Sequence, residues 1–386
     1  AFVFLSLGGV MGYAQVYRPL YEFTGGPNGG NPPSGVILDT QGAVYGTAGN
    51  GGCGILYKVD SSGDETVFYD FPNGRSGGCG PDTGVVRDGE GNFYGTTYAG
   101  GDEGCGAKQG CGVVFKIDTK GDETVLHAFT GYPDDGEYPT SVILGPDGSL
   151  YGTTYVGGSS DRGTIFKIDN KRNETILHNF SSSDGAEPYG KLLLDGGGNI
   201  YGTTFGGGNS GNKCDGMGCG VVFKLDPQGH EKILYNFQGE QDGGNPHAGV
   251  IEADGILYGT TYSAGSFEKD CGFTYGCGTV FALNKQGKLT VLHHFGASGD
   301  GQIPIGGVIR DPSGTLYGTT LYGGTYGYGT IFSLDSSGTE KILYDFCCWH
   351  GKMPEAGVVR DSAGHLYGTA YESGIHGYGL VWKLTP

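Results

Sequence analysis

Leu150-Tyr151-Gly152-Thr153-Thr154 is one of seven copies of a short phrase: an apolar residue, then Tyr-Gly-Thr, then Thr or Ala. Successive copies lie 49, 57, 50, 57, 59 and 50 residues apart. A fixed period near 50 residues is typical of the blades of a β-propeller or of a similar repeat array. The tyrosines of the seven copies are Tyr45, Tyr94, Tyr151, Tyr201, Tyr258, Tyr317 and Tyr367.

Four short segments of β type fill each period. In the third period they cover residues 141–144, 150–154, 163–169 and 174–180, separated by turns rich in Gly, Pro, Asp and Asn. Runs of β-branched and aromatic residues between such turns predict strands, and no window of helical length shows a 3.6-residue apolar period. Four antiparallel strands per unit, repeated around an axis, are the pattern of a propeller.

The two ends of the chain predict how the ring closes. Residues 17–23 match the fourth segment of a period, whereas the chain ends on residues 380–384, which match a third segment. Pairing the two ends completes the last blade and removes an open sheet edge that would invite aggregation. We expect an all-β, seven-bladed propeller of four-stranded antiparallel blades, with strand 17–23 in the last blade and residues 15–386 in one domain.

The composition fits a folded protein outside the cell. Of the 386 residues, 82 are Gly, which indicates many tight turns, while 26 Tyr and 19 Phe argue against a disordered chain. A net charge of −18 disfavours nucleic acid and anionic membrane surfaces as partners. The acidity suits solubility, with cation binding as the alternative.

The start of the chain predicts export. Residues 1–14 form an apolar run that ends in small residues, as in a secretory signal peptide truncated at its start. The run is too short to span a bilayer, and no other stretch approaches the necessary length. We therefore expect a secreted or cell-surface protein, monomeric, with no membrane span in the mature chain.

The ten Cys, an even number in an exported chain, favour disulfides. Three pairs are local and fall in the three longest periods. Cys53 takes the same slot without a local partner, and we expect it to meet Cys79, while Cys347 and Cys348 either form a vicinal bridge or stay free. Spacings of five and six residues without adjacent His do not fit zinc, so no metal site is predicted. The local pairs are Cys105 with Cys111, Cys214 with Cys219, and Cys271 with Cys277.

The repeat resembles the GloVer tandem-repeat family of bacterial extracellular proteins, whose members carry varied surface anchors. The resemblance covers the whole mature chain, through the seven Tyr-Gly-Thr phrases and segments such as residues 112–118, Gly-Val-Val-Phe-Lys-Ile-Asp. It implies export from a bacterial cell. It does not imply a particular activity, because no general activity is assigned to the family. No C-terminal sorting tail follows the last strand, so attachment to the surface is left open.

Positions that break the repeat are the candidates for a ligand site, because scaffold positions repeat and positions shaped by an asymmetric ligand need not. The residue after the recurring Pro of each blade-joining loop differs from copy to copy, with Thr140 in the third. These loops are expected at the top mouth of the central channel, and free drift of loop sequences is the alternative. The predicted ligand-binding residues are Asp82, Tyr138, Glu187, Tyr189, His247, His350, Lys352 and Glu355.

Other recurring polar residues favour structural roles. His127, His178 and His293 share a slot of the fourth strand with four Tyr residues, which suits packing with an exposed polar tip. The Asp residues of the blade-joining loops are expected to cap the backbone of their own turns. The alternative is that they form a ring that binds calcium. No Ser–His–Asp order, phosphate loop or His-rich metal motif is present. These Asp residues are Asp135, Asp184, Asp242 and Asp300.

The sequence favours a non-catalytic extracellular module that binds a glycan or a surface protein and needs no cofactor. The alternative is a secreted polysaccharide lyase or hydrolase with a His, Tyr or carboxylate pair at the channel mouth. A converging cluster with a strongly shifted pKa would favour the enzyme, whereas scattered polar residues would favour binding alone. Loop aromatics that suit stacking on sugar rings are Tyr262, Phe273, Tyr275, Tyr322, Tyr326, Tyr328, Tyr371 and Tyr378.

Overall fold

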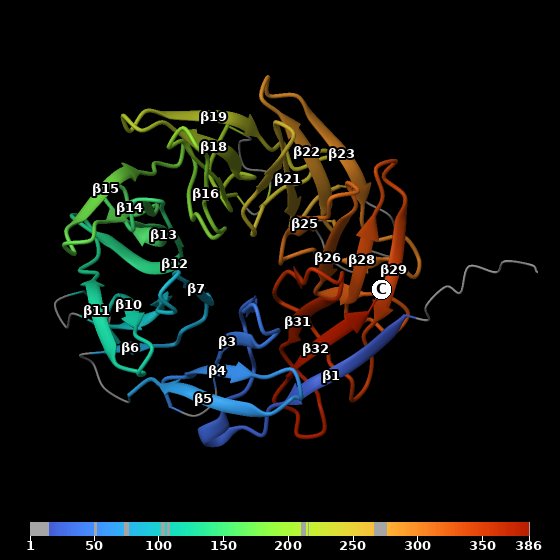
Figure 1. The fold of residues 1–386 in the computed structure, drawn as a ribbon. Coiled ribbons are helices and arrows are strands. Elements are labelled where there is room, and N and C mark those ends of the chain that lie inside the picture. The colour runs from blue at the N-terminus through green and yellow to red at the C-terminus, as the bar shows by residue number, and fades with distance from the viewer. Residues whose placement is uncertain are drawn as a thin grey trace, which may run out of the picture.

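The computed structural model describes residues 15–49, 52–72, 77–101, 105, 109–209, 214, 216–265 and 276–385. These residues form seven four-stranded antiparallel sheets, arranged as blades around a central channel (Figure 1). The predicted all-β, seven-bladed propeller is confirmed, and the described chain has one helical element, the 3-10 turn η1 (Gly26–Asn28). The expected signal peptide, residues 1–14, lies outside the described residues.

Each blade runs from an innermost strand at the channel to a fourth strand at the rim (Figure 1). Blade 1 contains β2 (Ile37–Leu38), β3 (Val44–Ala48), β4 (Ile55–Val59) and β5 (Glu65–Asp70). Blade 2 contains β7 (Val85–Arg87), β8 (Phe93–Thr97), β10 (Val113–Ile117) and β11 (Glu123–Ala128). Blade 3 contains β12 (Gly136–Leu144), β13 (Leu150–Gly157), β14 (Thr164–Ile168) and β15 (Glu174–Asn179).

The second half of the chain repeats this order. Blade 4 contains β16 (Leu193–Leu194), β17 (Ile200–Thr204), β18 (Val221–Leu225) and β19 (Glu231–Asn236). Blade 5 contains β20 (Ile251–Ala253), β21 (Ile256–Thr261), β22 (Thr279–Asn284) and β23 (Leu289–His294). Blade 6 contains β25 (Val308–Arg310), β26 (Leu316–Thr320), β28 (Thr330–Leu334) and β29 (Glu340–Asp345). Two-residue pairs join β6 (Gly78–Cys79) to β9 (Ala99–Gly100) and β24 (Gly301–Gln302) to β27 (Tyr322–Gly323).

Blade 7 joins the two ends of the chain. It contains β30 (Val359–Arg360), β31 (Leu366–Ala370), β32 (Leu380–Thr385) and, as its fourth strand, β1 (Val16–Glu22). β1 pairs antiparallel with β32 from Val16 opposite Thr385 to Glu22 opposite Leu380. In Figure 1 the blue β1 lies alongside the red β32 at the rim. The predicted closure of the ring by the N-terminal strand is confirmed.

The repeated Tyr-Gly-Thr phrase does three jobs in the blade. The Tyr hydroxyl donates to an Asp of the preceding turn, as from Tyr317 to Asp311 at 3.2 Å. The Gly makes room for an aromatic ring of the third strand, since a Cβ on Gly318 would lie 2.6 Å from Phe332. The Thr ties neighbouring blades together, as when the Thr319 hydroxyl donates to the carbonyl oxygen of Ala356 at 2.7 Å. One motif therefore fixes the turn, the core and the blade contact.

Aromatic rings fill the space between blades. At each of the seven interfaces, the Phe that follows a fourth strand lies against a third-strand ring of the next blade. Phe129 meets Phe166 with centroids 5.1 Å apart, and both side chains are fully buried. Edge-to-face aromatic pairs add stabilisation beyond the burial of apolar area. The other pairs are Phe23–Tyr57, Phe71–Phe115, Phe180–Phe223, Phe237–Phe281, Phe295–Phe332 and Phe346–Trp382.

The His/Tyr slot of the fourth strands also contacts the next blade. The Tyr69 hydroxyl donates to Glu123 of the following fourth strand at 2.9 Å. His127 instead lies 3.2 Å from Asp135 of the following loop. Asp135 also accepts the Thr130 backbone N–H at 2.8 Å, so the predicted turn-capping role of the loop Asp residues is confirmed there. Each of these Asp residues lies at a different blade interface, so they do not gather into one ring of ligands.

Disulfides tie the loops of one face. Cys53–Cys79, Cys105–Cys111 and Cys214–Cys219 form as predicted. Cys277 is also disulfide-bonded, and its predicted partner, residue 271, lies outside the described residues. Cys347 and Cys348 are free thiols. Across the described ranges, no helix is long and apolar enough to cross a membrane.

Candidate functional site at the channel mouth

The backbone just before the recurring Pro shapes the mouth of the channel. In all seven blades this residue has a positive φ, from 49° at Asn31 to 74° at Gly80, and six of the seven are not Gly. Its peptide groups are paired on both sides: the Glu187 N–H donates to Arg162 O at 3.0 Å, and Glu187 O accepts from the Phe205 N–H at 3.0 Å. A left-handed conformation is uncommon outside Gly, so the loop imposes it in every copy. The remaining members are Tyr138, Asn245, Ile303 and Met353.

Blade 3 departs from the common loop. The Thr140 hydroxyl bonds the Thr153 hydroxyl at 2.7 Å, just as Ser34 bonds Thr47 in blade 1 at 2.7 Å. Ser34 lies two residues after its Pro, whereas Thr140 follows its Pro directly. The interpretation of Thr140 as the counterpart of Asp82 is therefore wrong, because blade 3 lacks that residue.

Aromatic rings line the mouth from blade 3 to blade 5. Tyr189 stacks on His247 with ring centroids 4.4 Å apart, and Tyr155 lies 4.9 Å from Tyr189. The Phe205 ring contacts both the His247 ring and the Tyr262 ring. These five rings come from three successive blades. They form a curved wall, which we call the aromatic arc.

Blade 2 extends this wall. Tyr98 stacks on Tyr138 of blade 3 with centroids 4.3 Å apart and planes 9° apart. Burial raises the pKa of Tyr189, and nearby Tyr98 raises it further, so the two rings are close neighbours. Tyr98 is 46% exposed and Tyr189 is 38% exposed. Each ring thus keeps part of its surface exposed to solvent.

Carboxyl groups lie near the aromatic wall, since Asp82 and Tyr98 of blade 2 each have an atom 3.6 Å from the Cβ position of Gly80. Burial raises the pKa of Glu355 in blade 7 to about 7, with further contributions from Glu372 and from Asp82 of blade 2. Burial also raises the pKa of Tyr371, followed by the effects of Glu355 and Asp82. The Asp82 carboxyl also raises the pKa of Tyr189 of blade 4. Asp82 of blade 2 therefore lies near enough to residues of blades 4 and 7 to affect both electrostatically.

Two polar groups at the mouth, Asp82 and His247, are partly desolvated by the surrounding protein although they remain accessible to water. Asp82 is solvent-exposed, yet desolvation by the surrounding protein raises its pKa. His247 is partly exposed, and the same cause lowers its pKa to about 4, although a hydrogen bond to the Ile305 backbone opposes the shift. His247 is therefore a neutral ring at pH 7.

One lysine stands out at the start of the innermost strands. Lys191 takes a slot that is Gly35, Gly84, Gly249 and two further glycines in other blades. A Cβ on Gly249 would overlap the carbonyl group of Lys191, so the innermost strands of blades 4 and 5 are in backbone contact. Desolvation lowers the pKa of the Lys191 ammonium, which is consistent with its place among the walls of the channel.

The structure separates the eight predicted ligand residues into three groups. Asp82, Tyr189, His247 and Glu355 gather at the mouth. Tyr138 and Glu187 border it through Tyr98 and through Tyr155, whose hydroxyl donates to Glu187 at 3.1 Å. His350 and Lys352 have other contacts: the His350 carbonyl accepts from the Tyr17 hydroxyl, and the Lys352 backbone pairs with Glu372 while its ammonium sits 4.2 Å above Tyr328.

Three rings of the mouth escaped the sequence interpretation. Tyr98, Tyr155 and Phe205 each directly follow the Tyr-Gly-Thr-Thr phrase. That slot is aromatic in five of the seven copies, with Tyr262 and Tyr371 as the other two. The repetition marks a ring of aromatics around one end of the channel, and this signal was available in the sequence.

A cavity lies between blades 4 and 5, beside the turns at the opposite end of the propeller channel. Its volume is about 420 Å³, and Leu194, Leu234 and Leu257 are among its lining residues. Three lysines edge it, and it contains no converging group of buried acids or histidines among the described residues. We prefer the mouth as the candidate site because polar and aromatic groups of five blades converge there. The lysines are Lys224, Lys232 and Lys285.

A known repeat family matches most of the chain. The sequence pattern of the Gloeobacter/Verrucomicrobia repeat matches residues 10–214, 105–268 and 175–382. The chain belongs to this family. The resemblance inferred from the Tyr-Gly-Thr phrases is thus confirmed for this GloVer chain. No curated protein matches it.

Solved structures share the architecture at low identity. The extracellular domain of a protein described as the one-component system BT4673 of B. thetaiotaomicron is 14% identical, with a TM-score of 0.58, covering 96% of this chain and 42% of that one. A protein of Bacteroides uniformis assigned as a 6-phosphogluconolactonase is 16% identical, with a TM-score of 0.51 and coverages of 84% and 87%. A protein from Lactobacillus plantarum is 15% identical, with a TM-score of 0.50 and coverages of 92% and 88%. At these identities the likeness shows the fold alone.

Proposed function

We propose that this chain is an extracellular carbohydrate-binding propeller whose site is the mouth of the channel. The observation that carries the proposal is that Asp82 of blade 2 helps to raise the pKa of both Tyr189 of blade 4 and Glu355 of blade 7. Groups so far apart in the sequence influence one another electrostatically only if the fold brings them near each other. A recess with a few convergent polar groups beside aromatic walls is the usual form of a small-molecule site.

The chemistry of the mouth suits a sugar. A sugar ring presents C–H groups on its faces and hydroxyls on its rim. The exposed faces of Tyr98 and Tyr189 offer flat apolar surfaces for stacking. Asp82 and Glu355 offer carboxyl oxygens to the sugar hydroxyls, and neutral His247 adds a further polar edge without charge.

An extracellular location supports a glycan of a surface or matrix as the ligand. Disulfides persist in oxidising compartments, and seven described Cys are disulfide-bonded in this chain. The apolar run of residues 1–14 would direct the export. The strongly acidic surface favours a neutral glycan over a polyanionic one.

The test is a screen of immobilised oligosaccharides, followed by titration of each binder. We expect Tyr189→Ala to weaken binding by at least about tenfold, because it removes a stacking platform at the centre of the site. Tyr326→Ala serves as the matched control, since Tyr326, although the sequence named it among the aromatics suited to stacking, is 55% exposed and shares no ring contact with the aromatic arc among the described residues. Equal losses in both variants, or no binder in the screen, would refute the proposal.

Catalysis at the same site is the second candidate function. A converging cluster with a shifted carboxyl pKa is the feature that favours an enzyme, and Glu355 provides it with a pKa of about 7. A carboxyl that is partly protonated at neutral pH can donate a proton to a leaving oxygen, with the Asp82 carboxyl as the second carboxyl of the pair. A glycoside hydrolase uses such a pair of carboxyls.

Incubation of the bound oligosaccharides with the protein separates the two functions. New reducing ends or unsaturated products that vanish in Glu355→Gln would establish turnover and replace the non-catalytic proposal. Binding that persists in Glu355→Gln, with no product from the wild-type protein, would assign a binding module. His247→Ala tests the neighbouring ring in the same assay.

A further inference from the structure

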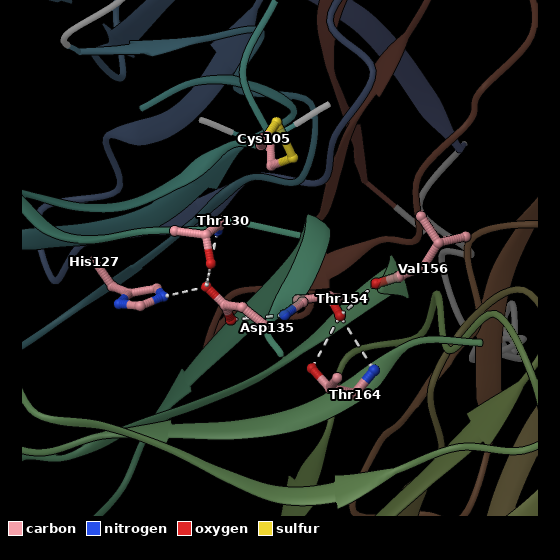
Figure 2. Close-up of polar contacts among 9 residues, drawn as sticks. Cys105, His127, Thr130, Asp135, Thr154, Val156 and Thr164 are labelled. Atoms are coloured by element: carbon pink, nitrogen blue, oxygen red, sulfur yellow. Dashed lines mark hydrogen bonds and ion pairs between the residues drawn. A yellow bond between two sulfur atoms is a disulfide. The ribbon is translucent and has the colours of Figure 1, made fainter. Parts of the chain in front are cut away.

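The outer rim of the propeller carries a second set of polar clusters, away from the channel mouth. At the blade 2–3 interface, His127 of β11, Asp135 of the joining loop and Glu174 of β15 come together. At the blade 5–6 interface, the equivalent residues His293, Asp300 and Glu340 come together. We call these two groups the rim clusters. Figure 2 shows the His127 ring pointing at the Asp135 carboxylate.

The spacing of the donor atoms is compact. His127 Nε2 lies 3.2 Å from Asp135 Oδ2, and His293 Nε2 lies 3.1 Å from Asp300 Oδ2. Glu340 Oε2 is 4.0 Å from His293 Nε2. One donor atom from each of the three residues lies within 4.8 Å of the others in both clusters. Small side-chain rotations would bring all three to a common centre.

The carboxylates are preorganised. Asp135 accepts the backbone N–H groups of Thr130 at 2.8 Å and Gly136 at 2.6 Å (Figure 2). Asp300 accepts those of Gly296 and Gly301 at 3.1 and 2.6 Å. Only 6% of Asp135 and 7% of Asp300 is exposed. Both carboxylates are therefore held in place behind their histidines.

The glutamate of each rim cluster has one carboxyl oxygen that accepts no hydrogen bond. Oε1 of Glu174 and Oε1 of Glu340 are buried and have no hydrogen-bond partner. The same oxygen is unpartnered in Glu65 and Glu123, whose neighbours in the slot are Tyr residues. The free oxygen is thus common to the repeat. The blade 3–4 interface carries the same three residue types, His178, Asp184 and Glu231. What distinguishes the two rim clusters is that one donor atom from each of their three residues lies within 4.8 Å of the others.

We propose that each rim cluster binds a divalent transition ion such as Zn²⁺, with one imidazole nitrogen and two carboxylate oxygens as ligands. Zn²⁺ binds His nitrogen and carboxylate oxygen at about 2.0–2.2 Å and accepts three protein ligands with a water in the fourth position. Ca²⁺ prefers six to eight oxygen ligands, which these clusters do not offer. The bound ion would clamp two adjacent blades together at the rim.

The repeat supplies its own controls. His178 at the blade 3–4 interface lies 3.3 Å from Asp184, but this site does not meet the spacing of the rim clusters, and its Asp side chain is 26% exposed. Tyr69 and Tyr235 occupy the His slot in blades 1 and 4. His→Tyr substitutions therefore introduce a residue that the fold already accepts at this position.

The experiment is calorimetric titration of the oxidised full chain with Zn²⁺, supported by the visible spectrum after loading with Co²⁺. We expect two ions per chain in the wild type, one in His127→Tyr or His293→Tyr, and none in the double variant. His178→Tyr should leave both ions in place. Saturating Zn²⁺ should raise the melting temperature of the wild type and leave that of the double variant unchanged.

Two outcomes would overturn the proposal. One is the absence of binding at micromolar Zn²⁺, which would leave the rim clusters as hydrogen-bonded contacts between blades. The other is binding that persists in the double variant and is lost in Cys347→Ser/Cys348→Ser, which would assign the ion to the free thiols. A Co²⁺ spectrum with sulfur-to-metal charge transfer would point to the same conclusion.

Discussion

The Tyr17 ring stacks on the Tyr344 ring with centroids 3.7 Å apart and planes 6° apart. Tyr17 comes from the N-terminal strand and Tyr344 from blade 6, so the contact spans the interface next to the chain closure. At the corresponding position of several other interfaces, a Tyr or His meets a Glu instead. The closing strand is thus fixed by a contact of its own in addition to its pairing with β32.

Tyr17→Ala should lower the free energy of unfolding by about 2–3 kcal/mol, because it removes the stack and the hydroxyl bond to the His350 carbonyl. Tyr17→Phe keeps the ring and should lose about 1 kcal/mol. Urea denaturation of both variants measures the difference. A Tyr17→Ala protein as stable as the wild type would show that the seam does not depend on this contact.

The Gly of the repeated phrase should tolerate no side chain. In Gly318→Ala the new methyl group would lie 2.6 Å from the buried Phe332 ring, so we expect a loss of about 1–3 kcal/mol in stability. Gly89→Ala is the matched control, because nothing lies within 4 Å of its Cβ position. Thermal melts of the two variants should therefore separate clearly. Similar melting temperatures would contradict the role assigned to the Gly.

Much of this architecture was predictable from the sequence, because it depends on local and repeated signals. The period of Tyr151 and its counterparts gave the number of blades, and the unmatched segment at Tyr17 gave the closure. The pairing of Cys53 with Cys79 followed from blade geometry. Contacts between residues far apart in the sequence were less accessible, since one sequence does not show which side chains face each other.

The candidate site illustrates this limit. Asp82 and Glu355 were selected because they break the repeat, yet their approach across the mouth depends on the curvature of the whole ring. Lys352 was selected by the same rule, but its ammonium turns to Tyr328. The displaced register of Thr140 was overlooked although the sequence shows it, because Tyr151 follows Pro139 by 12 positions whereas Tyr45 follows Pro32 by 13. The arc residue Tyr98 was missed although its slot repeats.

Glu355 should make the stability of the protein depend on pH. Burial raises the pKa of Glu355 to about 7 in the folded state from an ordinary value of 4.5, so the folded state binds its proton more tightly. Its ionisation therefore costs stability as the pH rises from about 4.5 to 7, and the cost is absent below that window.

Glu355→Gln removes this cost. We expect the variant to gain about 1–2 kcal/mol over the wild type at pH 8 and little at pH 4.5, after allowing for screening by water in the funnel. Urea denaturation at both pH values provides the measurement, with Glu90→Gln at an exposed turn as the control. A constant difference between the two pH values would show that the Glu355 carboxyl is not perturbed.

The disulfides should differ in their contribution to stability. Cys53–Cys79 spans 26 residues and Cys105–Cys111 spans 6. In the chain-entropy account, the larger loop gives about 3.5 kcal/mol and the smaller about 2 kcal/mol. The two double Cys→Ala variants should therefore rank in that order in urea denaturation. The reverse order would indicate that strain or residual structure outweighs loop entropy.

Binding of an oligosaccharide at the channel mouth is the claim on which the functional account rests. The most direct measurement is calorimetric titration of the tightest oligosaccharide from the screen into the wild type, Tyr189→Ala and Tyr326→Ala. We predict saturable binding at one site per chain, weakened at least about tenfold by Tyr189→Ala and unchanged by Tyr326→Ala. Undiminished affinity in Tyr189→Ala would contradict the claim.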